Sequence, residues 1–183
     1  MTENNIYNPE YVRNLFNEMA QTYDRVNYIT SFGFSLRWRI QFINKIKKDN
    51  KDIKVLDLMT GMGETWDIIK NNFPNATIDA LDYSDTMVEK ATIKKSQLNL
   101  SHLNVIHENI LKNKIESNSY DVITCAFGIK TFDKLQTEQF AKQVYRILKP
   151  GGYITFIEIS VPQNIILKDP MEPTYEWEQE PKK

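Results

Sequence analysis

An acidic residue followed by two glycines is the part of this sequence best suited to chemistry. The apolar run 55–58 contains Asp57 and leads into a turn with glycines at positions 61 and 63, after which a helical pattern begins. Glycine lets the backbone bend there and lets a ligand approach without meeting a Cβ atom. The amides at the start of the following helix favour a polar or anionic ligand group. The pattern therefore predicts a buried strand that turns sharply into a helix, with a ligand site at the turn.

A second acid, Asp82, ends the next apolar run, about 20 residues beyond the glycines. At that spacing a carboxylate can accept hydrogen bonds from ribose hydroxyls, so the two features together indicate a nucleoside cofactor. A dinucleotide site would need a third glycine where Trp66 stands, and the sequence contains no phosphate-loop motif. An acid just before a two-glycine turn suits a cofactor with a cationic amino-acid end, which is S-adenosylmethionine. The alternative is an ordinary strand-to-helix turn followed by a surface acid.

The elements around this turn alternate between strand and helix. Apolar runs predict strands at 54–58, 77–82, 105–107, 121–126 and 153–159, and apolar periodicity predicts helices at 9–20, 35–47, 64–72, 85–99 and 134–148. The last of these helices is followed by Lys149–Gly152, which has the composition of a helix stop and a turn. This alternation predicts an α/β fold with a parallel sheet, strand order 3-2-1-4-5 and helices on both faces.

Composition narrows the classes of function. The chain has 183 residues, enough for a sizeable core, and its net charge of −1 gives no electrostatic case for binding nucleic acid or an anionic membrane. No apolar run reaches membrane-spanning length, no signal-peptide pattern opens the chain, and Cys125 is the single cysteine. We therefore expect a cytoplasmic protein without an integral membrane segment. No cysteine or histidine spacing suits a metal site, so no metal is expected.

Five motifs, in order along the chain, give the sequence a family resemblance. They are Tyr23–Asn27 with Ser31–Gly33, Val55–Gly63, Ala80–Ser84 with Met87, Cys125–Lys130, and Arg146–Gly152. Through them the chain resembles the class I S-adenosylmethionine-dependent methyltransferases, and is most similar to the UbiE-like ubiquinone/menaquinone biosynthesis C-methyltransferases. The resemblance covers about residues 11–162. It implies a Rossmann-like fold, S-adenosylmethionine as the cofactor and a small-molecule methyl acceptor.

The resemblance also implies a role for each position that matches the family's motifs. The residues it assigns to the cofactor are Asp57, Thr60, Gly61, Gly63, Asp82, Tyr83, Met87, Asn109, Ala126 and Phe127. Asp57 would orient the amino-acid end, for which the two glycines make room. Asp82 would bind the ribose. Ala126 and Phe127 would lie near the methionine portion. No catalytic residue is assigned, and Tyr23 is the candidate contact to the substrate.

Each residue that the resemblance assigns to the adenine could instead have an ordinary structural role. Tyr83 and Met87 would flank the adenine ring and Asn109 would meet its amino group. Met87 can equally be a core residue, and Tyr83 can simply end a strand. Asn109 can be a turn residue whose side chain bonds its own backbone.

The same resemblance implies where the domains of the chain begin and end, and where the chain differs from its family. Residues 1–50 are predicted to be a helical lid or substrate segment, 51–162 the S-adenosylmethionine-binding domain, and 163–183, rich in proline and acids, a disordered tail. Family members complete a seven-stranded sheet, so the last two strands are expected to be absent here. The sheet would then have an exposed edge, which could pair with a second copy or another partner. Met59 stands where the family has a small residue, and is expected to crowd the cofactor's carboxylate or to point elsewhere.

Two classes of function remain open at this point. The first is an enzyme that transfers a methyl group from S-adenosylmethionine to a small molecule, with C-methylation of a quinone-like ring as the specific expectation. The second is a protein that binds the cofactor without catalysis, or a truncated domain, and acts through a partner. Cofactor binding without turnover on phenols or quinols would favour the second.

Overall fold

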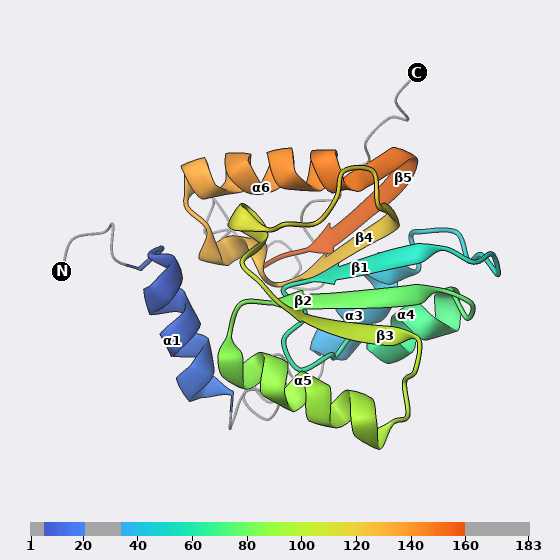
Figure 1. Ribbon diagram of the computed structural model, residues 1–183, viewed down its shortest axis with the longest axis horizontal. Helices are drawn as coiled ribbons and strands as arrows, with labels where there is room; N and C mark the ends of the chain where they lie inside the picture. Colours follow the sequence, from blue (N-terminus) through green and yellow to red (C-terminus); the bar gives the residue numbers. More distant parts are fainter. Residues whose placement is uncertain (1–5, 21–33, 160–183) are drawn as a thin grey trace, which may run out of the picture.

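The computed structural model describes residues 6–20 and 34–159 (Figure 1). The described elements are, in chain order, α1 (Pro9–Met19), α3 (Phe34–Ile43), β1 (Lys54–Leu58), α4 (Trp66–Asn72), β2 (Thr77–Asp82), α5 (Asp85–Gln97), β3 (Leu103–His107), the 3-10 turn η2 (Ile110–Lys112), β4 (Tyr120–Ala126), the 3-10 turn η3 (Ile129–Thr131), α6 (Lys134–Ile147) and β5 (Leu148–Ile157). Tyr23 and the tail predicted at 163–183 lie outside the described residues.

The five strands form one parallel sheet in the order β3-β2-β1-β4-β5, which confirms the predicted fold. Strand β1 lies between β2 and β4, so the strand order reverses beside it. In such sheets ligands bind at the carboxyl ends of the strands, next to the reversal. The register pairs Asp57 with Ala80 on one side and Thr124 on the other, which sets a strand hydroxyl beside the predicted acid.

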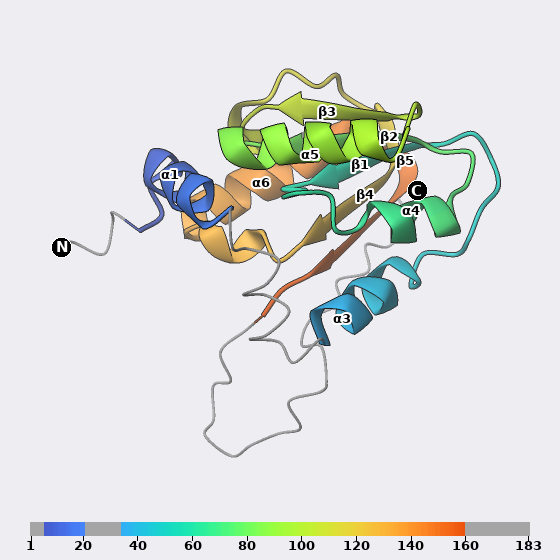
Figure 2. The same ribbon diagram turned by 90° about the horizontal axis from the view of Figure 1, so that it is seen from below.

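Helices cover both faces of the sheet, as predicted (Figures 1 and 2). Helices α3, α4 and α5 pack on one face, around the buried residues Phe42, Ile43, Val55, Trp66, Ile69, Ile78, Ala91 and Val122. Helix α6 and turn η2 pack on the other, around Leu56, Leu58, Leu81, Leu111, Ile123, Phe140, Val144 and Ile147. Helix α1 belongs to neither layer and lies at the carboxyl ends of the strands, beside the start of α5 (Figure 1).

The predicted bounds of β1 and β2 are confirmed, but β5 differs. Segment Lys149–Gly152, predicted as a turn, lies inside β5, which begins directly after α6. The pairing with β4 shifts register between Tyr120 and Val122, and Gly151 adopts a φ of +78°. The glycines therefore form an irregular part of the strand and not a separate turn. The sequence signal for a break was correct, and it produces an irregular stretch within the strand.

Candidate functional site

The turn after β1 takes the left-handed backbone that its glycines permit. Gly61 has a φ of +58° and Gly63 a φ of +82°, while Met59 adopts +52° without being a glycine. A Cβ on Gly63 would lie 2.5 Å from the Trp66 ring. This close approach explains how a large side chain fits at the third position of the turn: Trp66 is 1% exposed because Gly63 makes room for it.

Asp57 is held by three hydroxyl groups from different parts of the chain. Its Oδ2 accepts hydrogen bonds from Thr60 Oγ1 at 2.5 Å and Thr65 Oγ1 at 2.7 Å, and its Oδ1 accepts from Thr124 Oγ1 at 2.7 Å. The carboxyl is buried, which raises its pKa, and the three hydroxyl donors oppose that effect. Asp57 therefore fixes the turn to β1 and β4.

Asp82 links the ends of β1 and β2. Its Oδ2 accepts a hydrogen bond from the Gly61 amide at 2.8 Å and its Oδ1 accepts one from the Ser84 amide at 2.9 Å. Burial raises the pKa of Asp82, and the backbone amides around it oppose this effect. The two acids predicted to act together are thus joined through the glycine turn.

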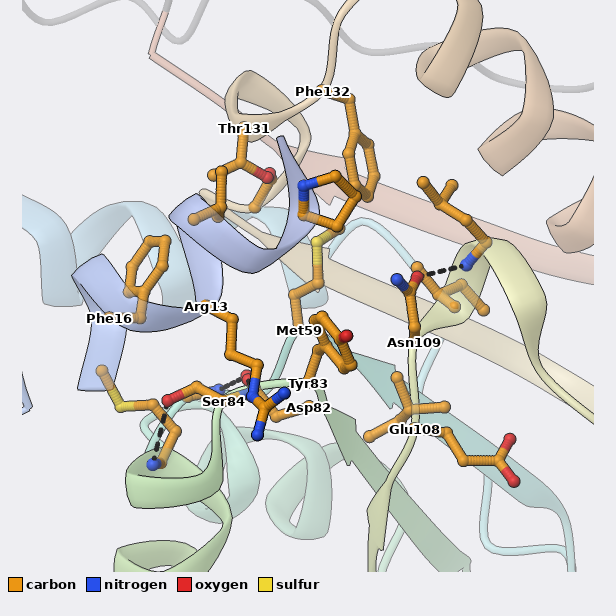
Figure 3. A pocket seen from close by; sticks show the side chains of 18 of the residues that line it. Arg13, Phe16, Met59, Asp82, Tyr83, Ser84, Glu108, Asn109, Thr131 and Phe132 are labelled. Atoms are coloured by element: carbon orange, nitrogen blue, oxygen red, sulfur yellow. Dashed lines mark hydrogen bonds between the residues drawn. The ribbon is translucent and has the colours of Figure 1, made fainter. Parts of the chain in front are cut away.

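The main cavity lies at the carboxyl ends of the strands (Figure 3). It encloses about 780 Å³, including space open to solvent, and its walls are mostly apolar. Ligand sites in proteins commonly have such mostly apolar walls. Its walls include seven of the predicted residues: Gly61, Asp82, Tyr83, Met87, Asn109, Ala126 and Phe127.

Helix α1 forms one wall of the main cavity, with Arg13 and Phe16 among its lining residues (Figure 3). A group of polar contacts holds it to the start of α5 and the residues before that helix. Arg13 forms an ion pair of 2.6 Å with Asp85, and its guanidinium lies 5.4 Å from the centre of the Tyr83 ring. The Tyr83 hydroxyl donates to Glu10 Oε1 at 2.5 Å. The hydrogen bond from Arg13 also lowers the pKa of Asp85. Helix α1 is therefore held by these contacts beside the end of the site where adenine was expected.

A smaller polar cavity adjoins the main one. It encloses about 290 Å³, and Met59, Gly61 and Ala126 belong to the walls of both cavities. Its other lining residues are Arg39, Asp57, Thr60, Glu64 and Thr65. The two cavities thus differ in character: the walls of the larger one are mostly apolar, and the walls of the smaller one carry charges of both signs.

The structure brings nine of the ten predicted cofactor residues to the walls of these two cavities. The exception is Gly63, which packs against Trp66 and whose carbonyl accepts a hydrogen bond from Lys94. Asn109 Oδ1 accepts from the Leu111 amide at 2.9 Å, so the side chain does bond its own turn while lining the cavity. Met87 is 1% exposed and is at once a core residue and part of the wall.

Sequence reasoning missed several wall residues. Arg13 and Phe16 come from α1, and Arg39 comes from α3; both helices precede the sheet in the sequence. Thr65 and Thr124, which orient Asp57, were also missed. A threonine beside a buried acid in the predicted strand register was the available signal for Thr124, because parallel pairing brings the two strands side by side.

Comparison with known proteins decides the family. The model of the ubiE/COQ5 methyltransferase family matches residues 4–179. The chain belongs to this family. It is 31% identical over 166 residues to a demethylmenaquinone methyltransferase of Lactococcus lactis, covering 90% of this chain and 65% of that protein. It is also 31% identical over 161 residues to the ubiquinone/menaquinone biosynthesis C-methyltransferase UbiE of Geotalea daltonii, covering 87% of this chain and 67% of that protein.

Solved structures agree with the fold. A SAM-dependent methyltransferase from Aquifex aeolicus superposes with a TM-score of 0.62 at 21% identity, covering 75% of this chain and 72% of that one. The predicted family and Rossmann-like fold are thereby confirmed, and the cofactor of this family of enzymes is S-adenosylmethionine. The chain spans 65% of the length of its Lactococcus relative. Within residues 6–20 and 34–159, no helix is long and apolar enough to cross a membrane.

Proposed function

We propose that this chain binds S-adenosylmethionine across its two cavities and transfers the methyl group to a small-molecule acceptor, a quinone-like ring that is methylated on carbon. The observation that carries the proposal is the link between Asp82 and the Gly61 amide at the boundary of the two cavities. It supports a nucleoside position and an amino-acid position on either side of one turn. The names of the relatives, demethylmenaquinone methyltransferase among them, support the acceptor class.

The residues present fit the two ends of the cofactor. The Asp82 carboxylate lines the main cavity, and a carboxylate can accept hydrogen bonds beyond the two it receives from the backbone. Tyr83 and Met87 offer apolar surface for the adenine ring in the same cavity. The amino-acid end of the cofactor is charged, and the polar cavity carries charged side chains. The walls therefore change in polarity from one cavity to the other, as the cofactor does along its length.

The chemistry needs little from the protein beyond alignment and exclusion of water. The bound cofactor supplies an activated methyl group on a sulfonium. The protein's part is to hold an acceptor atom in line with that group, which lowers the barrier by orientation. The apolar wall residues Phe16 of α1 and Phe132, which follows η3, would exclude water and accept an uncharged ring. In this proposal residues 1–50 form the lid over the site and 51–162 bind the cofactor, with Tyr23 as the candidate contact to the acceptor.

Calorimetric titration with S-adenosylhomocysteine, the demethylated cofactor, tests the binding step. Asp82→Ala should weaken binding by about 2–4 kcal/mol, because charge-assisted hydrogen bonds to the ribose are lost and the turn loses its tie to β2. Asp67→Ala is a matched control, since Asp67 is an exposed acid on α4 outside both cavities. An unchanged affinity in Asp82→Ala would contradict the ribose assignment.

Turnover separates the enzyme from the alternative function. Release of S-adenosylhomocysteine should be measured with a panel of demethylated quinols and phenols under reducing conditions. Transfer to a ring carbon, identified by mass spectrometry of the product, is the expected result. Tight binding of the cofactor with no transfer to any member of the panel would favour a binding protein that acts through a partner.

A further inference from the structure

The polar cavity carries one cationic and two acidic side chains, and the cation has no role yet. Arg39, Asp57 and Glu64 all line this cavity. We propose that Arg39 binds the α-carboxylate of the cofactor's amino-acid end, a proposal that rests on the proposed function. Arg39 is thereby a binding residue supplied by α3, a helix that precedes the sheet.

The guanidinium of Arg39 is held at the wall of the cavity. It lies 5.5 Å from the centre of the Phe127 ring, at the end of β4, in a cation–π arrangement. Its side chain is half-buried. Burial raises the pKa of Asp57, and the positive charge of Arg39 is one of the influences that oppose this, so the two groups sense each other across the cavity. Within residues 6–20 and 34–159, Arg39 forms no ion pair with a carboxylate.

Helix α3 gives this arginine a fixed position. Phe42 and Ile43 are buried at the end of the helix, and the Phe42 carbonyl accepts a hydrogen bond from Thr155 Oγ1 of β5 at 2.9 Å. One turn before Phe42, Trp38 packs against Phe127 with 6.4 Å between the ring centres. The helix is thus anchored to the sheet on both sides of Arg39. A side chain on such an element loses little further freedom when it binds a ligand.

Charge complementarity indicates which group of the cofactor's amino-acid end Arg39 would bind. The amino-acid end of S-adenosylmethionine carries an ammonium and a carboxylate on the same carbon. Asp57 and Glu64 favour the ammonium, but they would repel the carboxylate if the cavity held no cation. The planar guanidinium offers two parallel N–H donors, which match a carboxylate. In the main cavity the cationic side chain is Arg13, which already forms an ion pair with Asp85, so Arg39 is the better partner for that group.

Two ligands that differ only in the amino-acid end isolate the contribution of Arg39. S-adenosylhomocysteine has this end, whereas 5′-methylthioadenosine keeps the adenosine and the thioether and lacks it. In Arg39→Met we expect binding of S-adenosylhomocysteine to weaken roughly 10- to 100-fold, the effect of losing a charged hydrogen-bonded pair. Binding of 5′-methylthioadenosine should stay within about twofold of wild type, because its groups contact other parts of the site.

Two further variants separate recognition from charge and from folding. Arg39→Lys keeps the charge but not the paired donors, and should recover part of the lost affinity. Arg37→Met removes the same charge from an exposed position on the same helix and should bind both ligands as wild type does. Thermal unfolding of each variant, followed by circular dichroism, checks that α3 remains packed.

The outcomes are distinct. Equal weakening for both ligands, or no weakening for S-adenosylhomocysteine, in a folded Arg39→Met would overturn the assignment of Arg39 and leave the proposed function in place. A wild-type chain that binds neither ligand would overturn the proposed function, and the assignment with it. Weakening confined to S-adenosylhomocysteine, absent in Arg37→Met, is the result that supports Arg39.

Discussion

Replacing Thr124 by valine removes one hydroxyl donor from the buried Asp57 carboxylate and leaves the shape of the side chain almost unchanged. Thr124 Oγ1 is the donor within 2.7 Å of Asp57 Oδ1, and Thr124 itself is fully buried on β4. No cavity is created by the substitution. Any loss of stability in Thr124→Val therefore reports the interaction with the carboxylate.

The size of the effect follows from the charge and burial of Asp57. A hydrogen bond to a charged group contributes about 1.5–3 kcal/mol, and removing the donor leaves the carboxylate with less compensation for its burial. We expect the free energy of unfolding of Thr124→Val to fall by about 2–3 kcal/mol at neutral pH. For a chain of this length the midpoint of thermal unfolding would fall by roughly 4–12 °C.

The raised pKa of Asp57 determines how the stability difference between wild type and Thr124→Val changes with pH. Burial raises the pKa of Asp57 above that of the unfolded chain, so ionisation of this group costs stability as pH rises through the folded pKa. Thr124 Oγ1 opposes that rise, and its removal raises the pKa further. The difference between wild type and variant should therefore be largest at high pH and shrink as Asp57 becomes protonated.

Urea unfolding of both proteins between about pH 5 and pH 8, within the usual range of maximal stability, measures this difference. Thr92→Val is the control, because the Thr92 hydroxyl is exposed and donates to the Val88 carbonyl of its own helix. The reasoning is refuted by a loss below about 0.5 kcal/mol, the range of ordinary surface substitutions. It is refuted as well if the loss grows as pH falls, which is the opposite of the direction that the raised pKa of Asp57 requires.

Two further predictions concern the walls of the main cavity. In Gly128→Ala the new methyl group would lie 2.7 Å from Met59 Sδ and 2.9 Å from its Cβ, so we expect a loss of about 1–3 kcal/mol in urea unfolding. Adding Met59→Gly removes both atoms, and the double variant should be more stable than the sum of the single effects predicts; strict additivity would contradict the contact. Arg13→Met should speed amide exchange along α1 with little change in global unfolding, and the difference from wild type should diminish at high salt. Exchange rates identical to wild type at low salt would show that the ion pair with Asp85 does not hold the helix.

The fold and one half of the site could be predicted because their signals are local. Glycines at 61 and 63 permit the left-handed backbone that they adopt, and the acid at 82 ends a strand whose bounds the apolar run defines. Strand order followed from the alternation of elements and from the preference for right-handed crossovers. These features depend on residues that are neighbours in the sequence.

The other half depends on contacts between distant parts of the chain. Met59 and Phe127 adopt φ values of +52° and +60°, which bulky side chains rarely take, so no pattern in the sequence signals them. Arg13 finds Asp85 only once α1 docks on α5. In the sequence Arg39 is one polar residue of a predicted helix, and only the fold brings it beside Phe127 and the polar cavity. Tertiary packing, rather than local preference, makes these residues part of the site.

The position of helix α1 has a consequence for ligand binding at the main cavity. It supplies a wall of the main cavity from outside the two layers of helices that cover the sheet, and polar contacts through Arg13, Asn17 and Glu10 hold it there. This wall of the main cavity is thus present only while α1 is docked. A ligand that touches α1 would then bind with an apparent affinity reduced by the fraction of molecules in which the helix is undocked.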